Sequence, residues 1–424
     1  MVSARLSPAQ RLERDSAEVR ARYRILREHT RGATDPLRLL VVISITHGAE
    51  RHLPRSLPRL FAQTRARGCA VDLLLGCNNG YQSRELDAWL EKHSGCRVIE
   101  GFCSKLAADR PAAIVDRGGA PLLISATHPD EDRCFLIRQR PAPQARSGVA
   151  AGKIRMLGDL YGLIADSIAA GWHPPRLLLA CDAESEFELA APWSLEQAGE
   201  PGLARLLERF ANEADLDLLG TRNRFAAFET LPDGSRQPRL DWRLPSMQLY
   251  LNLVHSRAHG FMWMPGGGTL GRTEALTALL AVICSHYPSM RIEDTQTTLL
   301  GRSAGFGVAI DTRVCSLNRC ASPAEKDLAI GQLERYISGQ KDLEEKYGRE
   351  VGRIVPGSTF TIIAAGVKMA LVEIFSALAA GGGRRLAGTL LNTAHIIGAL
   401  PTHIRIKLRA PKDRSDDPDF SASW

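Results

Sequence analysis

Two carboxylates, Asp182 and Glu184, stand one residue apart after a short apolar run from Leu177 to Cys181. An apolar run of this length, bounded by turn signals, is typical of a buried strand. In a tight turn after a strand, both carboxylates can face one cation, and Mg²⁺ or Mn²⁺ prefers such oxygen ligands together with phosphate oxygens. A helix N-cap or a solvated loop would use the same residue types, so the pair alone leaves three interpretations open.

Two further groups with chemical potential flank this pair in the chain. Lys153 follows Gly152 at the start of a predicted helix, where its ammonium could reach a diphosphate or could simply be solvated. Three consecutive glycines, Gly266, Gly267 and Gly268, allow the backbone to pass close to a ligand or only to turn. Both groups therefore favour the interpretation of the two carboxylates as part of a phosphate-binding site.

A second acidic pair and a polar helix face come later. Glu293 and Asp294 are adjacent, and a carboxylate of this kind can serve as a general base. Gln332, Arg335 and Tyr336 have a spacing that places amide, guanidinium and ring on one side of a helix. An ordinary helix surface is the alternative interpretation of these three residues.

The elements that must position these residues alternate between strands and helices. Strands are expected at 37–46, 70–77, 96–102, 176–181 and 216–225, and helices at 53–68, 83–95, 153–171 and 274–287. Such alternation predicts an α/β fold with a mostly parallel, Rossmann-like sheet covered by helices. Ligands of such sheets bind at the carboxyl ends of the strands, where Asn78, Asn79, Asp182 and Glu184 stand.

Several segments depart from this alternation. Residues 104–150 interrupt it, and the turn His128-Pro129-Asp130 inside them predicts an inserted hairpin. Residues 1–36 are dense in charge and are expected to form an exposed N-terminal helix rather than a signal peptide. The main domain is thus expected to span 37–340, followed by a helical region at 341–410 and a disordered tail at 411–424.

Composition narrows the class of protein. The 424 residues are 44% hydrophobic and 24% charged, with a net charge of +7, as in a globular protein with a mild basic excess. Basic clusters fit phosphate-bearing ligands or an anionic membrane surface, and the absence of an aromatic-interleaved basic stripe argues against nucleic acid. The nine cysteines include no CxxC pair, which indicates reduced thiols and a cytoplasmic location.

The C-terminal segment 357–409 is apolar but carries Lys368 and Glu373 within its first apolar stretch. Neither of its two apolar stretches is a clean span of about 20 residues, which a bilayer crossing requires. Amphipathic helices that contact the inner face of a membrane peripherally are therefore expected.

The ordered set of motifs resembles the family 2 glycosyltransferases, enzymes with the GT-A nucleotide-sugar fold, including polysaccharide synthases. The resemblance covers roughly residues 38–340. It rests on "VVISITHGAE", "VDLLLGCNNG", "AGKIRMLGDL", "CDAES", "GGGTLGRTEAL", "IEDT" and "QLERY". In "CDAES", Glu184 stands where the family's D-x-D motif has its second Asp, and in "QLERY", Tyr336 replaces the family's Trp. The transmembrane helices of polysaccharide synthases have no counterpart, so the C-terminal region is expected to be a helical appendage.

The resemblance implies roles for individual residues. Asp182 and Glu184 would hold Mg²⁺ or Mn²⁺, and Asp294 would be the catalytic base. The donor-binding residues would be Thr46, Glu50, Asn78, Asn79, Lys153, Asp182, Gln332, Arg335 and Tyr336. The acceptor-binding residues would be Gly267, Gly268, Glu293 and Trp263.

The function expected on this basis is that of an inverting, metal-dependent hexosyltransferase. It would move a sugar from a nucleotide-diphospho-sugar, a UDP-sugar in the first instance, to a hydroxyl of a saccharide or lipid-linked acceptor in polysaccharide biosynthesis. Two alternatives stay open: a sugar-1-phosphate nucleotidyltransferase on the same kind of sheet, and a degenerate, non-catalytic transferase that acts as a membrane-associated binding protein.

Overall fold

The computed structural model of the chain describes a defined set of residues, to which every structural statement below refers. These are residues 6–31, 35–45, 49–77, 84–92, 97–103, 114–115, 123, 132–138, 153–189, 201–226, 228–230, 236–238, 267–287, 293–319, 342–343, 345–348, 371, 374–375 and 378–379.

A ten-stranded, mostly parallel sheet forms the centre of the molecule, in the order β4-β3-β5-β2-β1-β6-β11-β8-β12-β7. Its strands are β1 (Asp35–Ile45), β2 (Ala70–Cys77), β3 (Arg97–Cys103), β4 (Ile114–Val115), β5 (Arg133–Arg138), β6 (Pro175–Asp182), β7 (Glu186–Leu189), β8 (Leu218–Ala226), β11 (Thr269–Arg272) and β12 (Val308–Arg319). The strands from β3 to β6 are parallel to one another, and β12 is parallel to β8. β11 is antiparallel to both of its neighbours, β6 and β8. The predicted α/β class is confirmed.

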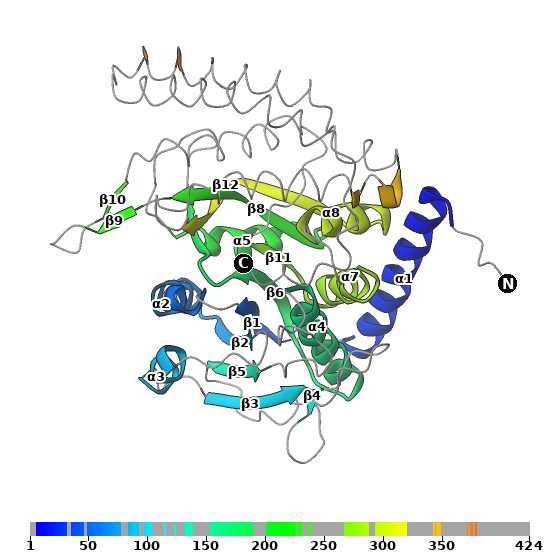
Figure 1. Ribbon diagram of the computed structural model, residues 1–424, viewed down its shortest axis with the longest axis horizontal. Helices are drawn as coiled ribbons and strands as arrows, with labels where there is room; N and C mark the ends of the chain where they lie inside the picture. The colour runs from blue at the N-terminus through cyan, green and yellow to red at the C-terminus, as the bar shows by residue number, and fades with distance from the viewer. Residues whose placement is uncertain are drawn as a thin grey trace, which may run out of the picture.

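Helices cover both faces of this sheet (Figure 1). They are α1 (Pro8–His29), α2 (Leu53–Arg65), α3 (Arg84–Lys92), α4 (Lys153–Ala169), α5 (Leu203–Asn212), α7 (Thr273–His286) and α8 (Glu293–Ser303), with a 3₁₀ turn η1 (Ala49–His52). One hydrophobic core lies between the sheet and α1, α4, α7 and α8, and the other lies between the sheet and α2, α3 and α5. A separate pair, β9 (Phe228–Thr230) and β10 (Arg236–Pro238), forms a small antiparallel hairpin.

The strand β5 corrects the expectation of an inserted hairpin within 104–150. β5 lies inside the main sheet, between β2 and β3, and pairs in parallel with both. Because both of its edges are occupied by parallel partners, it cannot be the arm of a local antiparallel hairpin. Most other residues of 104–150 lie outside the described residues, and the domain boundaries stay predictions.

A buried ion cluster explains why β5 enters the sheet. Asp72 on β2 is fully buried and accepts hydrogen bonds from Arg38 on β1 and from Arg133 on β5, with Nε to Oδ1 distances of 3.1 and 2.7 Å. Next to it, Asp132 accepts the backbone N–H of Val71 at 2.8 Å. Ion pairs between strands that are distant in sequence therefore hold β5 in the sheet. A local hydrophobic pattern does not reveal this placement.

One face of the helix α1 departs from the expectation of an exposed N-terminal helix. It forms as predicted, with Ser7 as its N-cap, but its Asp15 side chain is fully buried. This carboxylate accepts hydrogen bonds from Arg14 at 2.8 Å, from Tyr347 at 3.0 Å and from Tyr287. Burial and the bond to Asp15 raise the pKa of Tyr287 to about 12, so this phenol stays a hydrogen-bond donor. α1 is therefore an integral layer of the domain.

No helix within the described parts of the chain combines the length and apolar character that a bilayer crossing needs.

Replacing Asp72 tests whether the buried cluster fixes the sheet. We expect Asp72→Asn to lower the free energy of unfolding by about 3–5 kcal/mol, because it leaves two buried guanidiniums without their anion. Urea unfolding measures the loss. Glu208→Gln, which breaks the exposed Arg67–Glu208 pair at 3.4 Å, is the control and should cost less than about 1 kcal/mol. Equal effects of the two variants would contradict the prediction.

Candidate active site

The carboxyl ends of the central strands lie at one level along one edge of the sheet. Ile45 is in register with Cys77, Cys77 with Arg138, and Ser44 with Asp182. Because the chain leaves β1 and β2 here, the segments that hold Thr46, Asn78 and Asn79 start at this edge. Those three residues themselves lie outside the described residues.

The turn after β6 holds Asp182 and Glu184 in a closed hydrogen-bonded frame. The Ser185 N–H donates to the Asp182 carbonyl at 3.0 Å, and the Asp182 N–H donates to Ser185 Oγ at 3.2 Å. From α2, the Ser56 hydroxyl donates to the Ala183 carbonyl at 2.6 Å. Ala183 and Ser185 are buried, whereas the two acidic residues are half-buried. Burial thus alternates along the turn, and the accessible positions are the two carboxylates.

This donor set fits a hard divalent cation. Within the described residues, no group of three Asp, Glu, His or Cys side chains gathers around a common point. Mg²⁺ in phosphate-handling sites is commonly held by one or two carboxylates and completed by substrate phosphates and water. Asp182 and Glu184, half-accessible on one turn, match such an incomplete protein shell, whereas they would not form an all-protein metal cage.

An acidic residue after the turn ties it to α2. Glu186 forms ion pairs with Arg55 at 3.0 Å and with Arg59. Burial raises the pKa of the Glu186 carboxyl, and the two arginines offset only part of this effect. Gln63 on the same helix donates to the Phe187 carbonyl at 3.1 Å. The backbone on the far side of the turn is therefore fixed by contacts from α2.

The first turn of α4 lies over the carboxyl end of β2. An added Cβ at Gly76 would lie 2.6 Å from the end of the Met156 side chain and 2.8 Å from that of Leu160, so α4 packs closely on the backbone of β2 here. Lys153 is the first residue of α4, three positions before Met156, and so its backbone lies toward the carboxyl edge. The free N–H groups of a helix N-terminus favour an anion there.

Two glycines open β11 beside Asp182. Thr269 is in register with Ala180 on the antiparallel strand β6, which brings the preceding glycines alongside Cys181 and Asp182. Gly267 has φ +114°, a conformation that other residues rarely adopt. A Cβ at Gly268 would lie 2.4 Å from the ring of Phe187. The backbone conformation at Gly267 and the packing at Gly268 thus each explain why glycine stands there. Contact of these two glycines with an acceptor stays a prediction, and Gly266 lies outside the described residues.

The second acidic pair, Glu293 and Asp294, begins α8. α8 leads into β12, which starts at the amino edge of the sheet, so α8 begins toward the carboxyl edge. Asp294 is half-buried, and its Oδ1 accepts the Thr295 N–H at 2.8 Å. The carboxylate is held against the helix start, where the helix dipole stabilises its charged form.

Ser44 is a further candidate that the sequence reasoning missed. It is in register with Asp182 and, among the described residues, its buried hydroxyl has no hydrogen-bond partner. Paired residues of parallel strands point to the same face, so Ser44 and Asp182 share the α4 side of the sheet. The sequence feature that could have singled out Ser44 is its hydroxyl, which stands one residue before the end of an otherwise apolar strand.

The other predicted site residues divide into two groups. Glu50 lies in η1, directly after the β1 segment, and its side chain is buried at 7% exposure. The remaining ones lie outside the described residues: Trp263, Gln332, Arg335 and Tyr336.

The likenesses found between this chain and known proteins are distant. No family model and no curated protein matches the sequence. Among solved structures, the mannosyltransferase PcManGT from Pyrobaculum calidifontis, in complex with GDP-Man and Mn²⁺, is 11% identical with a TM-score of 0.43 and covers 93% of this chain and 99% of its own. Mannosyl-3-phosphoglycerate synthase from Rubrobacter xylanophilus is 12% identical with a TM-score of 0.36 and coverages of 81% and 85%. Residues 1–349 of TarS from S. aureus are 10% identical with a TM-score of 0.30 and coverages of 85% and 92%. At these values the likenesses carry no functional argument.

Replacing Gly268 tests the close packing beside Asp182. We expect Gly268→Ala to lower the free energy of unfolding by about 1–3 kcal/mol, because the new methyl group overlaps the Phe187 ring. Phe187→Leu removes the obstructing ring edge, so the double variant should be more stable than the sum of the two single losses predicts. Chemical denaturation of all three variants measures this coupling, and strictly additive losses would contradict the contact.

Proposed function

We propose that this chain is an inverting glycosyltransferase with a GT-A-type site at the carboxyl edge of its sheet. The observation that carries the proposal is convergence at this edge: the Asp182–Glu184 turn, the starts of α4 and α8, and the glycines that open β11 all lie there. Ligands of open α/β sheets bind at this edge. The order of these elements is the order that the family 2 resemblance requires.

The donor is a nucleotide-diphospho-sugar, with a UDP-sugar as the first candidate. Asp182 and Glu184 hold Mg²⁺ or Mn²⁺, which, when bound, supplies Lewis-acid stabilisation of the leaving diphosphate. Lys153 and the N-terminus of α4 add positive potential for the same phosphates. The chain thereby places its cationic groups where negative charge develops as the sugar–phosphate bond breaks.

Asp294 is the catalytic base in this proposal. Its carboxylate accepts the proton of the acceptor hydroxyl, whose oxygen forms the new bond to the anomeric carbon as the diphosphate departs. A single in-line displacement inverts the configuration of that carbon. The ionised carboxylate that this step requires is consistent with the helix start that stabilises its charge.

The acceptor is a saccharide or lipid-linked hydroxyl that lies along Gly267 and Gly268, with Glu293 nearby. The backbone of these glycines is fixed rather than adaptable, because Ser316 donates to the Gly267 carbonyl at 2.8 Å and Thr221 donates to the Gly268 carbonyl at 3.3 Å. Such a fixed wall orients an acceptor at little entropic cost.

Two conservative variants test the assigned roles. We expect Asp294→Asn to lower kcat by about 10²–10⁴-fold, because it removes the general base. We expect Asp182→Asn to weaken the dependence of turnover on Mn²⁺ concentration and to lower kcat. Sugar transfer and donor hydrolysis are measured with a panel of UDP-, GDP- and dTDP-sugars, with Mn²⁺ and with EDTA.

Asp166→Asn is the matched control, because Asp166 is exposed on α4 and makes the same chemical change away from the carboxyl edge. Wild-type rates in a folded Asp294→Asn variant would refute the assignment of the base. Formation of a nucleotide-sugar from a sugar-1-phosphate would instead identify a nucleotidyltransferase. Absence of turnover with every donor, with binding retained, would identify a non-catalytic binding protein.

A peripheral membrane contact through residues 357–409 is proposed separately. Within the described residues of this segment, Leu371, Phe375 and Leu378 are helical and are 49%, 66% and 56% exposed. Their spacing places them on one face of a helix. An exposed apolar face on a helix is one part of the pattern of a helix that lies in a membrane interface, and the sequence adds Lys368, Arg384 and Arg385 on either side.

Co-sedimentation with anionic vesicles at low salt tests this contact. We expect the wild-type chain to sediment with the vesicles and Phe375→Asp to remain largely in the supernatant, because an aspartate opposes burial of the apolar face. Ile25→Asp, at a residue of α1 that is 54% exposed, is the control for an exposed apolar residue elsewhere. A wild-type chain that stays in the supernatant would contradict the proposal.

A further inference from the structure

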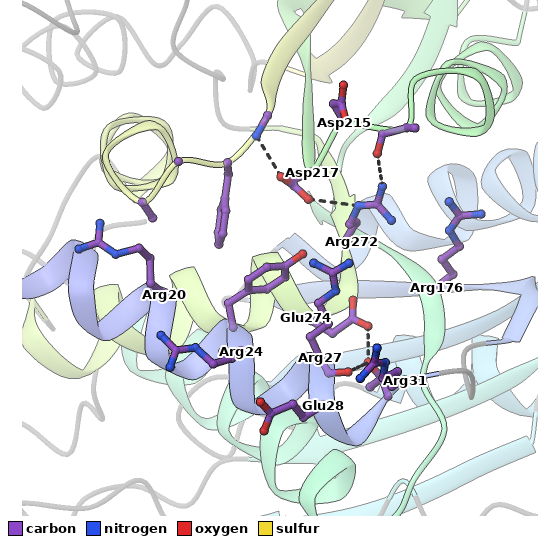
Figure 2. A pocket seen from close by; sticks show the side chains of 17 residues that line it. Arg20, Arg24, Arg27, Glu28, Arg31, Arg176, Asp215, Asp217, Arg272 and Glu274 are labelled. Carbon is purple, nitrogen blue, oxygen red and sulfur yellow. Dashed lines mark hydrogen bonds and ion pairs between the residues drawn. The ribbon is translucent and has the colours of Figure 1, made fainter.

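A second concave site lies at the opposite, amino edge of the sheet. A cavity of about 970 Å³ opens there between α1 and the segments that start β6, β8 and β12 and end β11 (Figure 2). Its cationic lining consists entirely of arginines: Arg20, Arg24, Arg27, Arg31, Arg176 and Arg272. This arginine pocket, as we call it, has a volume in the range of small-molecule sites.

The deeper polar groups of the arginine pocket are already paired with protein atoms. Arg272 lies 3.1 Å from Asp217 and donates to the Ala214 carbonyl at 2.6 Å. Asp217 also accepts the Gly307 N–H at 3.0 Å. Glu274 accepts the Thr30 hydroxyl at 2.5 Å. These contacts fix the floor of the cavity. Two of the acidic side chains that line it, Asp217 and Glu274, are therefore already engaged by protein groups.

The remaining charges are strongly unequal. In the part of the chain that the structure describes, Arg24, Arg27, Arg31 and Arg176 form no ion pair with a carboxylate. The acidic residues that remain in the lining are Glu28 and Asp215. Four guanidiniums therefore face two carboxylates, an excess of two positive charges around one recess.

The walls that carry these guanidiniums are held in place. α1 is anchored by its buried residues Val19 and Leu26, and Tyr23 packs edge-on against Phe306 with ring centroids 4.9 Å apart. Figure 2 shows the arginines of α1 along one side of the recess and Arg176 on another side. The charges are thus presented from rigid elements, which lowers the entropic cost of binding an anion.

We propose that the arginine pocket binds a soluble anion that carries two or more linked phosphate groups. Guanidinium groups donate paired hydrogen bonds that match phosphate oxygens, and they stay protonated at all physiological pH values. Several guanidiniums on different walls favour an extended anion with adjacent phosphates over a single phosphate. A recess with a paired polar floor favours a soluble ligand over a flat membrane surface.

This site is separate from the proposed donor site. Arg176 and Asp182 lie near opposite ends of β6, and the six residue steps between them span about 20 Å of extended strand. The proposal therefore does not depend on the transferase assignment, and each can fail without the other.

Calorimetric titration with inorganic tripolyphosphate tests the proposal. It is carried out on the full chain at low salt in EDTA, which suppresses any metal-dependent binding at the carboxyl edge. We expect Arg24→Ala/Arg31→Ala to weaken binding by at least about tenfold per arginine, since each loses a charge-assisted hydrogen bond. The control is Arg22→Ala/Arg67→Ala, which makes the same charge change outside the pocket and should bind as the wild type does.

Arg176→Ala provides a second variant on the β6 wall, should the Arg24→Ala/Arg31→Ala variant fail to fold. Equal affinities of the pocket and control variants, or no binding by the wild type, would overturn the proposal. A further arm uses vesicles that contain phosphatidylglycerol. Vesicle binding that is lost in the pocket variants, without binding of tripolyphosphate, would also overturn it and would indicate a membrane-facing basic surface.

Discussion

The buried contact of Asp72 with Arg38 and Arg133 sets the frame on which the rest of the molecule depends. It joins β1, β2 and β5, and it lies in the interior, where a misaligned strand would leave a charge without its partner. Hydrophobic strands that are buried on both faces specify register weakly by pattern alone. A central carboxylate with two guanidiniums specifies it strongly, since a slip of one residue would turn each side chain to the opposite face.

From that register follows the alignment of the strand ends. Once Leu40 is opposite Asp72 and Asp72 is opposite Arg133, β1, β2 and β5 finish at the same level. The polar segments that leave the sheet then begin side by side, together with the turn after β6. At the amino edge, the arginine pocket lies away from this contact, because its lining comes from α1 and from the segments around β6, β8, β11 and β12. The Asp72 contact thus aligns the strand ends at the carboxyl edge, whereas α1 completes the basic pocket at the amino edge.

Local patterns predicted most elements because those elements depend on local periodicity. The strand at 70–77 and the helices α4 and α7 formed almost at the expected residues, since each has a continuous apolar run or face. β5 was predicted incorrectly because its place depends on Asp72, about sixty residues earlier in the chain. The burial of one face of α1 was not predicted for a similar reason: Asp15 lies among exposed charged residues, and its partners Tyr287 and Tyr347 are far away in sequence.

The acidic residues of the candidate site could be predicted from the sequence, but the contacts that hold them in place could not. Asp182 and Glu184 could be singled out because carboxylates at the end of a strand are chemically conspicuous. Nothing in the local sequence indicates that Ser56 and Ser185 fix the turn, or that Ser44 lies beside it. These contacts depend on how β1, β6 and α2 meet in space, and a hydroxyl in a sequence has too many possible partners for its bond to be assigned.

The rigidity of this turn has a consequence for charge. Two carboxylates held one residue apart repel each other, and a flexible loop would relieve the repulsion by letting them separate. Here the bonds from Ser56 and Ser185 hold the backbone between them, and Arg55 is already engaged by Glu186 on the far side of the turn. Movement of the backbone is therefore restricted, so the cation that we propose for this turn would bind to carboxylates whose positions along the chain are already fixed. In the proposed site, the hydrogen-bonded frame around Asp182 would contribute as much to holding a divalent ion as the acidic pair itself.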